Sequence, residues 1–239
     1  MVYYSECRKR KIQKTEVLKM TGDSISTSTS VMKTLLNRYP ALTACAGKIV
    51  DAYCILRDSI REGGTVFVCG NGGSHADADH IIGELSKGFL SKRKVPEEIV
   101  RQFSENLGED ASGLCARLQM GIRAMLLSAH PALSSAYAND VDPRMCYAQQ
   151  LFVAGRKGDV VIGLSTSGNA ENIRNVFQVA GGLGIRRILF TGNRHGACER
   201  YADCVIDVPE AETYKIQELH LPVYHAVCIM LEEYFYGGK

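Results

Sequence analysis

TVFVCGNGGSHADADHIIGEL, residues 65–85, predicts a strand, a glycine-rich loop and a helix in direct succession. The apolar run Thr65–Cys69 does not alternate with polar residues, which is typical of a strand buried on both faces. Small residues follow it as a loop, and the residues after Ser74 have helical character. This order of elements is typical of a parallel sheet whose strands are joined by helices.

The same order recurs further along the chain. Three more short apolar runs predict strands, and the first two are followed by STSGN and TGN: Val160–Leu164, Arg187–Phe190 and Cys204–Val208. A helical stretch, Glu171–Ala180, lies between two of them. We therefore predict an α/β fold with a doubly wound parallel sheet flanked by helices, in which ligands bind beyond the carboxyl ends of the strands.

Helical patterns flank this core on both sides. Val31, Leu35 and Leu36 form a short stripe that Pro40 separates from a second helix, and Gly63-Gly64 ends the second. Glu218–Phe235 predicts a C-terminal helix. In the less regular part, Lys92–Lys94 and Pro96 indicate a surface loop, and helices are expected at Ile99–Leu107 and Leu114–Leu127. Residues 1–23 are expected to be a mobile extension, and residues 24–239 a single domain with N-terminal helices.

Composition excludes several classes of protein. A net charge of +2 gives no global field for nucleic acid or acidic membranes, and no apolar run approaches the length of a membrane span. The N-terminal basic run lacks the apolar segment of a secretory signal. Nine cysteines stand at irregular spacing without a CxxC pair, so reduced thiols in a cytoplasmic protein are expected instead of disulfides or a thiol zinc site.

Two loops after predicted strands have the composition of phosphate sites. In Gly70-Asn-Gly-Gly-Ser74, small residues let the backbone approach an anion, and the next helix presents free N–H groups. Ser165-Thr-Ser-Gly-Asn169 adds three hydroxyls. A tight turn with a helix cap explains one such loop, but two in one chain favour phosphate binding. Neither loop has the dinucleotide or Walker pattern, so a nucleotide cofactor is not expected.

Two groups of side chains can move a proton. His80 and Glu84 share a helix face at i and i+4, where they could supply a base and a ligand or two metal ligands; a surface pair is the alternative. Gln217 and His225 lie two turns apart if the C-terminal helix is continuous. Pro222 belongs either to its first turn or to a kink.

These segments together resemble the phosphoheptose isomerases, a branch of the SIS-domain proteins. The similarity runs from about Ala44 to Glu232, through CGNGGSHADADHIIGEL, Asn139-Asp140, GDVVIGLSTSGNAEN, ILFTGN and IQELHLPVYH. The resemblance implies the SIS fold, a flavodoxin-like sheet, and a homotetramer with sites shared between subunits. It implies no nucleic-acid or membrane partner.

The resemblance also assigns roles to residues. It implies Glu84 as the general base and His225 as its partner acid. It implies a zinc ion held by His80, Glu84, Gln217 and His225. The residues implied to contact the sugar phosphate are Asn71, Gly72, Gly73, Ser74, Glu84, Asn139, Asp140, Ser165, Thr166, Ser167 and Gln217.

Three departures from the family pattern bear on the substrate. Ala170 stands where the family has a serine, Tyr214 where it often has an aspartate, and residues 87–138 form a longer segment than usual. The expected reaction is a ketose–aldose isomerisation of sedoheptulose 7-phosphate to D-glycero-D-manno-heptose 7-phosphate through an enediol. The alternatives are a non-catalytic SIS protein that binds a sugar phosphate or a partner such as DnaA, and an isomerase of another C7–C8 sugar phosphate.

Overall fold

The computed structural model describes residues 24–237, and the extension predicted for residues 1–23 lies outside the described residues. Its centre is a parallel five-stranded sheet in the order β2-β1-β3-β4-β5. The strands are β1 (Val66–Gly70), β2 (Ala124–Leu126), β3 (Val160–Leu164), β4 (Arg186–Thr191) and β5 (Cys204–Asp207). The predicted parallel sheet is confirmed.

The strand order fixes where a ligand can bind. From β1 the chain first adds β2 on one side, then returns to place β3 on the other side, with Val66 opposite both Ala124 and Val160. The order therefore reverses between β1 and β3. In open α/β sheets, a crevice forms at this switch point, outside the carboxyl ends of the two strands.

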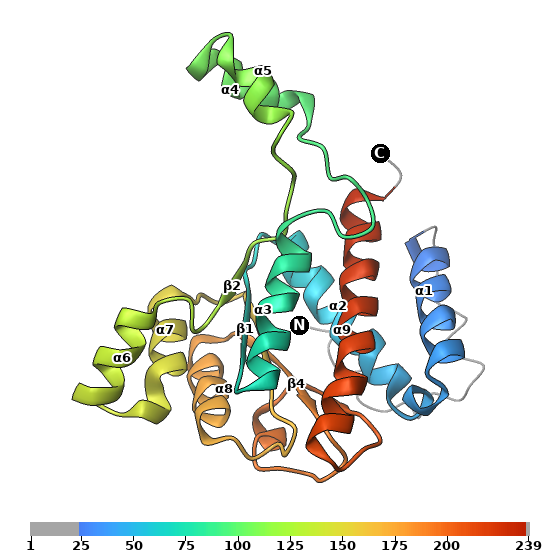
Figure 1. The fold of residues 1–239 in the computed structure, drawn as a ribbon, viewed down its shortest axis with the longest axis vertical. Helices are drawn as coiled ribbons and strands as arrows, with labels where there is room; N and C mark the ends of the chain where they lie inside the picture. The colour runs from blue at the N-terminus through green and yellow to red at the C-terminus, as the bar shows by residue number, and fades with distance from the viewer. Residues whose placement is uncertain (1–23, 238–239) are drawn as a thin grey trace, which may run out of the picture.

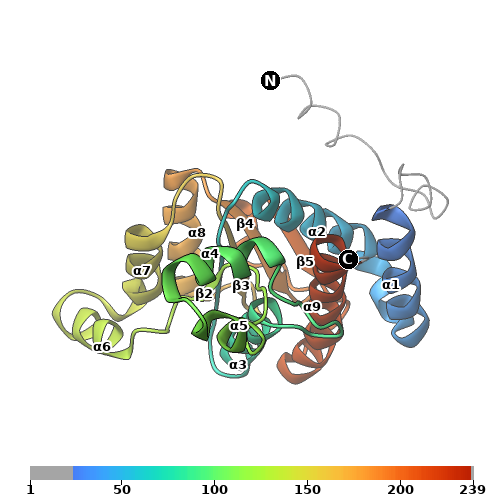
Figure 2. The same cartoon turned by 90° about the horizontal axis from the view of Figure 1, so that it is seen from above.

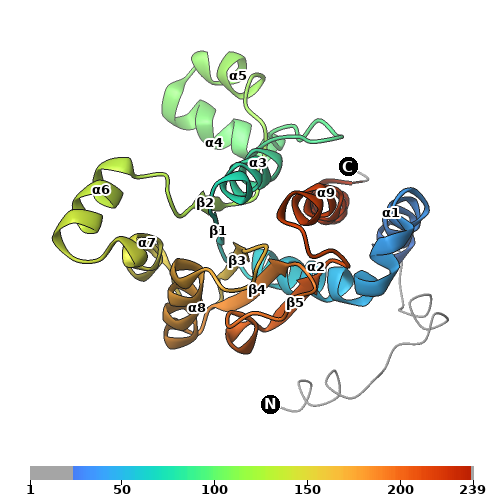
Figure 3. The same ribbon diagram turned by 60° about the horizontal axis from the view of Figure 1, so that its bottom comes forward.

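Helices cover both faces of the sheet (Figure 3). On one face lie α1 (Ser24–Arg38), α2 (Ala46–Arg61), α3 (Gly73–Ser86) and α9 (Thr213–Tyr236); on the other lie α7 (Cys146–Ala154) and α8 (Glu171–Leu183). Successive residues of β1 feed opposite cores: Val66 and Val68 pack with the first set of helices, Phe67 and Cys69 with the second. This double burial explains why the strands lack polar alternation.

The connection after α3 leaves the body of the molecule. It carries α4 (Glu97–Leu107) and α5 (Asp110–Cys115), which project away from the sheet in Figure 1. Lys94 and Gln119 form an antiparallel bridge at its base. Seen from above, α4 overlies the sheet and α5 overlies α3 (Figure 2). We call residues 95–118 the arm.

Sequence prediction was right for part of this segment and wrong for part. The predicted helix Ile99–Leu107 is present as α4, whereas Leu114–Leu127 is not one helix: α5 ends at Cys115, and the edge strand β2 follows. The residues of β2 are Ala, Met and Leu, which favour helices, and pairing with β1 overrides that preference. The expected surface loop at Lys92–Lys94 has exposed lysines, but Arg93 between them is 2% exposed.

Two prolines noted in the sequence, Pro40 and Pro222, both lie in helices. The first helix ends at Arg38, and a short 3₁₀ helix, η1 (Pro40–Cys45), leads into α2. Pro222 lies inside α9, which is continuous from Thr213 to Tyr236. The chain is completed by α6 (Pro131–Asp140), η2 (Pro143–Met145) and η3 (Glu199–Tyr201). Among the described residues, no helix has both the length and the apolar character needed to cross a membrane.

Candidate active site

The loop after β1 is shaped by two glycines. Gly72 has a φ of 55°, a left-handed conformation that favours glycine, and α3 begins directly after it. A Cβ on Gly73 would lie 2.7 Å from Nε2 of Gln217, so the bare backbone lets α9 approach the loop. Ser74 is buried, and its Oγ accepts a hydrogen bond of 3.4 Å from Gln217.

The two predicted phosphate loops lie side by side. Asn71 follows β1 and Asn172 begins α8, and their side-chain amides exchange two hydrogen bonds of 3.0 and 2.8 Å. Because β1 and β3 are neighbours in the sheet, this pair joins the loops across the switch point. The pair therefore joins the loop after β1 to the first turn of the helix that follows the second loop.

The hydroxyls of the loop after β3 differ in their surroundings. Ser165 is buried, and its Oγ accepts a 3.4 Å hydrogen bond from the backbone N–H of Ala170. Ser167 is exposed, and its Oγ accepts from the N–H of Asn169 at 3.2 Å. Thr166 is half-buried. Ser167 thus presents a hydroxyl to solvent near the start of α8, where unpaired backbone N–H groups favour an anion.

A second cluster lies where α3 packs beside α9. Nε2 of His80 is 3.1 Å from Oε1 of Glu84, so the predicted shared face is observed. The ring of His225 lies edge-on to that of His80, with 5.0 Å between centroids. The ring of Phe89 covers His225 at 5.4 Å. Three of the four residues predicted to bind a metal therefore lie close together.

Two buried polar atoms of this cluster lack a hydrogen bond. Oε2 of Glu84 and Nε2 of His225 are buried and make no hydrogen bond with the described residues. Lys87 forms only a long ion pair of 4.0 Å with Oε2. Burial lowers the pKa of His225, and His80 lowers it further, while the Glu84 carboxylate opposes both effects. An unpartnered buried polar atom costs free energy, so these two atoms are candidates for contact with a ligand.

Tyr224 supports His80 from behind, which the sequence did not indicate. Its Oη lies 3.0 Å from Nδ1 of His80 and donates a 3.2 Å hydrogen bond to Oδ1 of Asp77. Burial raises the pKa of Tyr224, and the nearby Asp77 carboxylate raises it further, so the phenol stays protonated. The hydrogen bond between Nε2 of His80 and the Glu84 carboxylate needs a proton on Nε2, because a carboxylate oxygen only accepts.

Whether the cluster suits a metal can be judged from its donors. Two imidazoles, a carboxylate and an amide oxygen are a set that zinc accepts. The orphaned atoms of Glu84 and His225 and the support of His80 fit such an ion. Gln217, the fourth predicted ligand, instead donates a hydrogen bond to Ser74. No three His, Cys, Asp or Glu side chains are gathered as a ready metal site among the described residues.

Asn139 and Asp140 lie further out, at the end of α6. Both are exposed, and their side chains bond one another at 2.8 Å. Their neighbour Ala138 lines a cavity of about 640 Å³ that also includes Asn71 and Gly72. The pair therefore follows a residue that lines this cavity, and the structure does not bring it into the cluster of α3 and α9.

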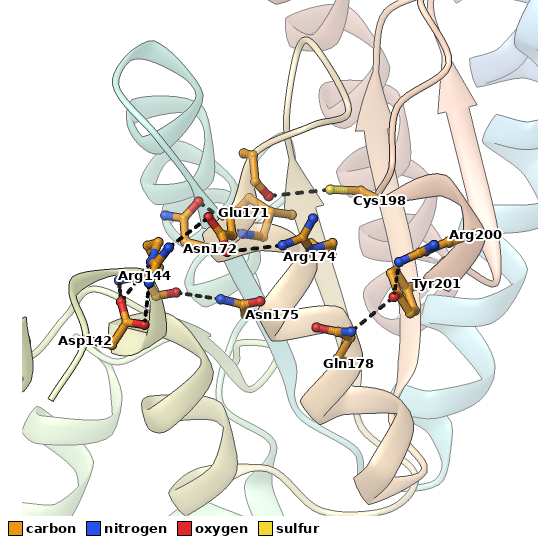
Figure 4. A network of polar contacts seen from close by, with 12 residues as sticks. Asp142, Arg144, Glu171, Asn172, Arg174, Asn175, Gln178, Cys198, Arg200 and Tyr201 are labelled. Atoms are coloured by element: carbon orange, nitrogen blue, oxygen red, sulfur yellow. Dashed lines mark hydrogen bonds and ion pairs between the residues drawn. The ribbon is translucent and has the colours of Figure 1, made fainter.

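A polar network fixes the segment that follows this pair (Figure 4). Nε of Arg144 bonds Asp142 at 3.0 Å, and Nη1 lies 3.4 Å from Glu171 at the start of α8. Nδ2 of Asn175 donates to the carbonyl of Arg144 at 3.2 Å. The network ties the chain after α6 to the helix that follows the second phosphate loop.

Comparison with known proteins finds relatives over most of the chain. Residues 31–106 and residues 150–230 each match a SIS domain family. The chain is 35% identical to the phosphoheptose isomerase of Burkholderia pseudomallei over 217 residues, which cover 91% of this chain and 95% of that one. It is 31% identical to the phosphoheptose isomerase of Akkermansia muciniphila over 204 residues, covering 85% and 94%.

Solved structures agree in fold. A phosphoheptose isomerase from Neisseria gonorrhoeae superposes with a TM-score of 0.66 at 24% identity, covering 87% of this chain and 94% of that one. One from Francisella tularensis gives 0.67 at 23% identity, covering 89% and 100%.

Proposed function

The chain belongs to the phosphoheptose isomerase family of SIS-domain proteins, and from that premise we propose that it converts sedoheptulose 7-phosphate to D-glycero-D-manno-heptose 7-phosphate. The reaction is a ketose–aldose isomerisation through an enediol. The observation that carries the proposal is the pair of buried, unpartnered atoms, Oε2 of Glu84 and Nε2 of His225, beside two loops suited to a phosphate.

The chemistry needs two proton carriers of different kinds. We assign Glu84 to the carbon-bound proton, because a carboxylate with one unpartnered oxygen can accept it. His225 would exchange the oxygen-bound proton, since an imidazole changes its charge near neutral pH. Their two helices pack side by side, so both groups can reach adjacent carbons of one substrate.

The phosphate end is assigned to the two loops. Ser165, Thr166 and Ser167, with the N-terminus of α8, would hold the phosphate, and Asn71 to Ser74 would hold the adjoining part of the sugar. Asn139 and Asp140 would close the rim. Fixing a remote phosphate aligns the reacting carbons with Glu84 and His225, which is a contribution of position.

A zinc ion is the proposed cofactor. His80, Glu84, Gln217 and His225 would hold it, and when bound it would polarise the substrate carbonyl and stabilise the enediolate. Elemental analysis of protein purified without chelator tests this. Absence of any transition metal, combined with full activity in chelator, would remove zinc from the proposal.

Two alternatives are less well supported. A non-catalytic SIS protein that senses a sugar phosphate or binds DnaA has no use for a carboxylate and imidazoles held at one site. An isomerase of another C7–C8 sugar phosphate would use the same groups, and the departures at Ala170 and Tyr214 bear on that choice. Tyr214 is exposed, so its ring leaves the liganding side of α9 unchanged.

Assembly and location are further parts of the proposal. We expect a homotetramer whose subunits share sites, supported by family membership; a stable monomer in light scattering would contradict it. We expect the protein in the cytoplasm, supported by eight cysteines without a disulfide among the described residues. Cell fractionation checks this.

A coupled isomerase assay across C5 to C8 ketose phosphates tests the function. We expect the highest kcat/KM for sedoheptulose 7-phosphate and slow turnover of shorter ketose phosphates. Higher kcat/KM for another seven- or eight-carbon ketose phosphate would favour the second alternative. Binding of these sugars without any turnover would favour the non-catalytic one.

A further inference from the structure

A buried ion pair lies directly behind the proposed catalytic groups. Arg93 is 2% exposed and Glu232 1% exposed, and Nε of Arg93 donates to Oε1 of Glu232 at 2.8 Å. The guanidinium also stacks on the ring of Tyr236, with 4.8 Å to its centroid. The two residues are 139 positions apart, so the pair joins the segment just before the arm to α9.

The other N–H groups of Arg93 donate hydrogen bonds to the helix that carries Glu84. Its Nη1 bonds the carbonyl of Leu85 at 2.7 Å, and its Nη2 bonds the carbonyl of Glu84 itself at 3.0 Å. These carbonyls lie in the last turn of α3, where no further turn supplies N–H donors. A planar guanidinium with several fixed donors therefore holds the backbone of Glu84 at a set distance from α9.

Glu232 holds the segment whose Phe89 ring covers His225. Its carboxylate accepts hydrogen bonds from the N–H groups of Phe89, Leu90 and Ser91 at 2.7, 2.8 and 3.1 Å. These bonds place the ring of Phe89 on His225. Glu232 also follows His225 by seven residues on α9, which puts both on one side of the helix.

Stability alone is a poor explanation for such a pair. Removing two charges from water costs several kcal/mol per ion, and replacing a buried pair with neutral residues is often neutral or stabilising. Burial alone would raise the pKa of Glu232, but the amides of Phe89 and Leu90 and the charge of Arg93 lower it overall. The carboxylate therefore stays ionised, and its bonds to the backbone of residues 89–91 place the ring of Phe89 on His225.

We propose that Arg93 and Glu232 are positioning residues of the isomerase, which set the distance between the Glu84 carboxylate and the His225 imidazole. The inference rests on the proposed function of those two groups. Arg93 acts on Glu84 through its backbone carbonyl, and Glu232 acts on His225 through Phe89. Neither residue contacts substrate.

The test neutralises both charges together, so that neither is left buried alone. The double variant Arg93→Met/Glu232→Gln keeps similar volume and an oxygen for the loop amides. We expect a folded protein with KM near that of the parent and kcat reduced about 10–100-fold, since small misplacements of reacting groups have effects of this size. Exchange of the substrate C1 proton with solvent should fall by the same factor. Arg93→Lys, which keeps the charge but not the fork, should fall in between.

The matched control removes a bidentate pair elsewhere. Arg187 bonds Asp203 at 2.9 and 3.0 Å beside β4 and β5, and Arg187→Met/Asp203→Asn should lower stability without lowering kcat. Equal kcat in the two double variants overturns the inference while the proposed function stands. If the test variant does not fold, wild-type kcat in Arg93→Lys overturns it instead. A parent protein without proton exchange overturns the proposed function and this inference together.

Discussion

Single residues in this protein differ most in how their polar atoms are satisfied. Oε1 of Glu84 bonds His80, whereas Oε2 is buried and unpartnered. Ser165 and Ser167 lie two positions apart, yet one hydroxyl serves the turn and the other is exposed. We expect substrate to bind at polar atoms that lack a protein hydrogen bond, because such atoms lose no protein hydrogen bond when substrate binds.

Ser167→Ala tests the phosphate loop. The variant should raise KM for the phosphorylated sugar about 10–100-fold, because a hydrogen bond to a charged group contributes about 1.5–3 kcal/mol. Steady-state kinetics measures it, with Ser104→Ala on the exposed arm as the control. If affinity stays unchanged in Ser167→Ala and also in Thr166→Val, the phosphate lies elsewhere.

His220 gives the fold a dependence on pH. It is fully buried, and its ring lies 3.3 Å from the carbonyl of Thr191. Burial lowers the pKa of His220 from 6.5 to about 4. Between pH 6.5 and about 4, the unfolded chain therefore binds a proton at His220 that the folded chain does not bind. The contribution of neutral His220 to the free energy of unfolding is complete above pH 6.5 and is lost as the pH falls toward 4.

Over that window the free energy of unfolding should fall by about 1.4 kcal/mol per pH unit from this residue. Denaturant titrations of the parent and of His220→Gln measure the difference between them. The gap should change with pH between 6.5 and 4 and stay constant above 6.5. Parallel curves through the window would show that His220 is not the group responsible.

At the scale of elements, the fold was predictable where one strand or helix carries its own signal. The unbroken apolar runs located β1, β3, β4 and β5, and the i, i+4 spacing located His80 and Glu84 on α3. The strand β2 was missed because its three residues favour a helix and only pairing with β1 makes them a strand. Contacts between elements were also missed, since they depend on how α3 crosses α9.

Arg93 and Tyr224 illustrate that limit. Arg93 stands in a basic run that indicates a surface loop, and its burial depends on Glu232, 139 positions later. Tyr224 lies between polar and apolar residues of α9, and its contact with His80 appears only when the two helices are packed. The candidate site was therefore predictable as a set of reacting residues, but the groups that hold them in place were not.

The arm is an element that the core does not need. No residue of 95–118 belongs to either apolar cluster among the described residues, and its ends meet at the Lys94–Gln119 bridge. Replacing residues 95–118 with a short Gly-Ser linker should leave the melting temperature close to that of the parent. Leu56→Ala in the core, by comparison, should cost about 2–5 kcal/mol. A linker variant that loses cooperative unfolding would contradict this view.

In the whole molecule, the fold brings proposed site residues that are far apart in the sequence close together. The strand order brings the loops after β1 and β3 together, and α9 returns across the sheet to bring His225 to α3 and Gln217 to the first loop. The buried pair of Arg93 and Glu232 then links the end of α3 to α9. The central claim that follows is that Glu84, held in this frame, is the base of a sugar-phosphate isomerase.

Solvent proton exchange tests that claim most directly. Sedoheptulose 7-phosphate is incubated in deuterated water with the parent protein or with Glu84→Gln, and the deuterium gained at C1 is measured by NMR. The parent should exchange this proton, and the variant should be slower by about 10²–10⁴-fold while it stays folded, because loss of a positioned base has that effect. Metal content is measured in both proteins, since Glu84 is also a proposed zinc ligand. Exchange at the parent rate in Glu84→Gln would place the base elsewhere and contradict the account.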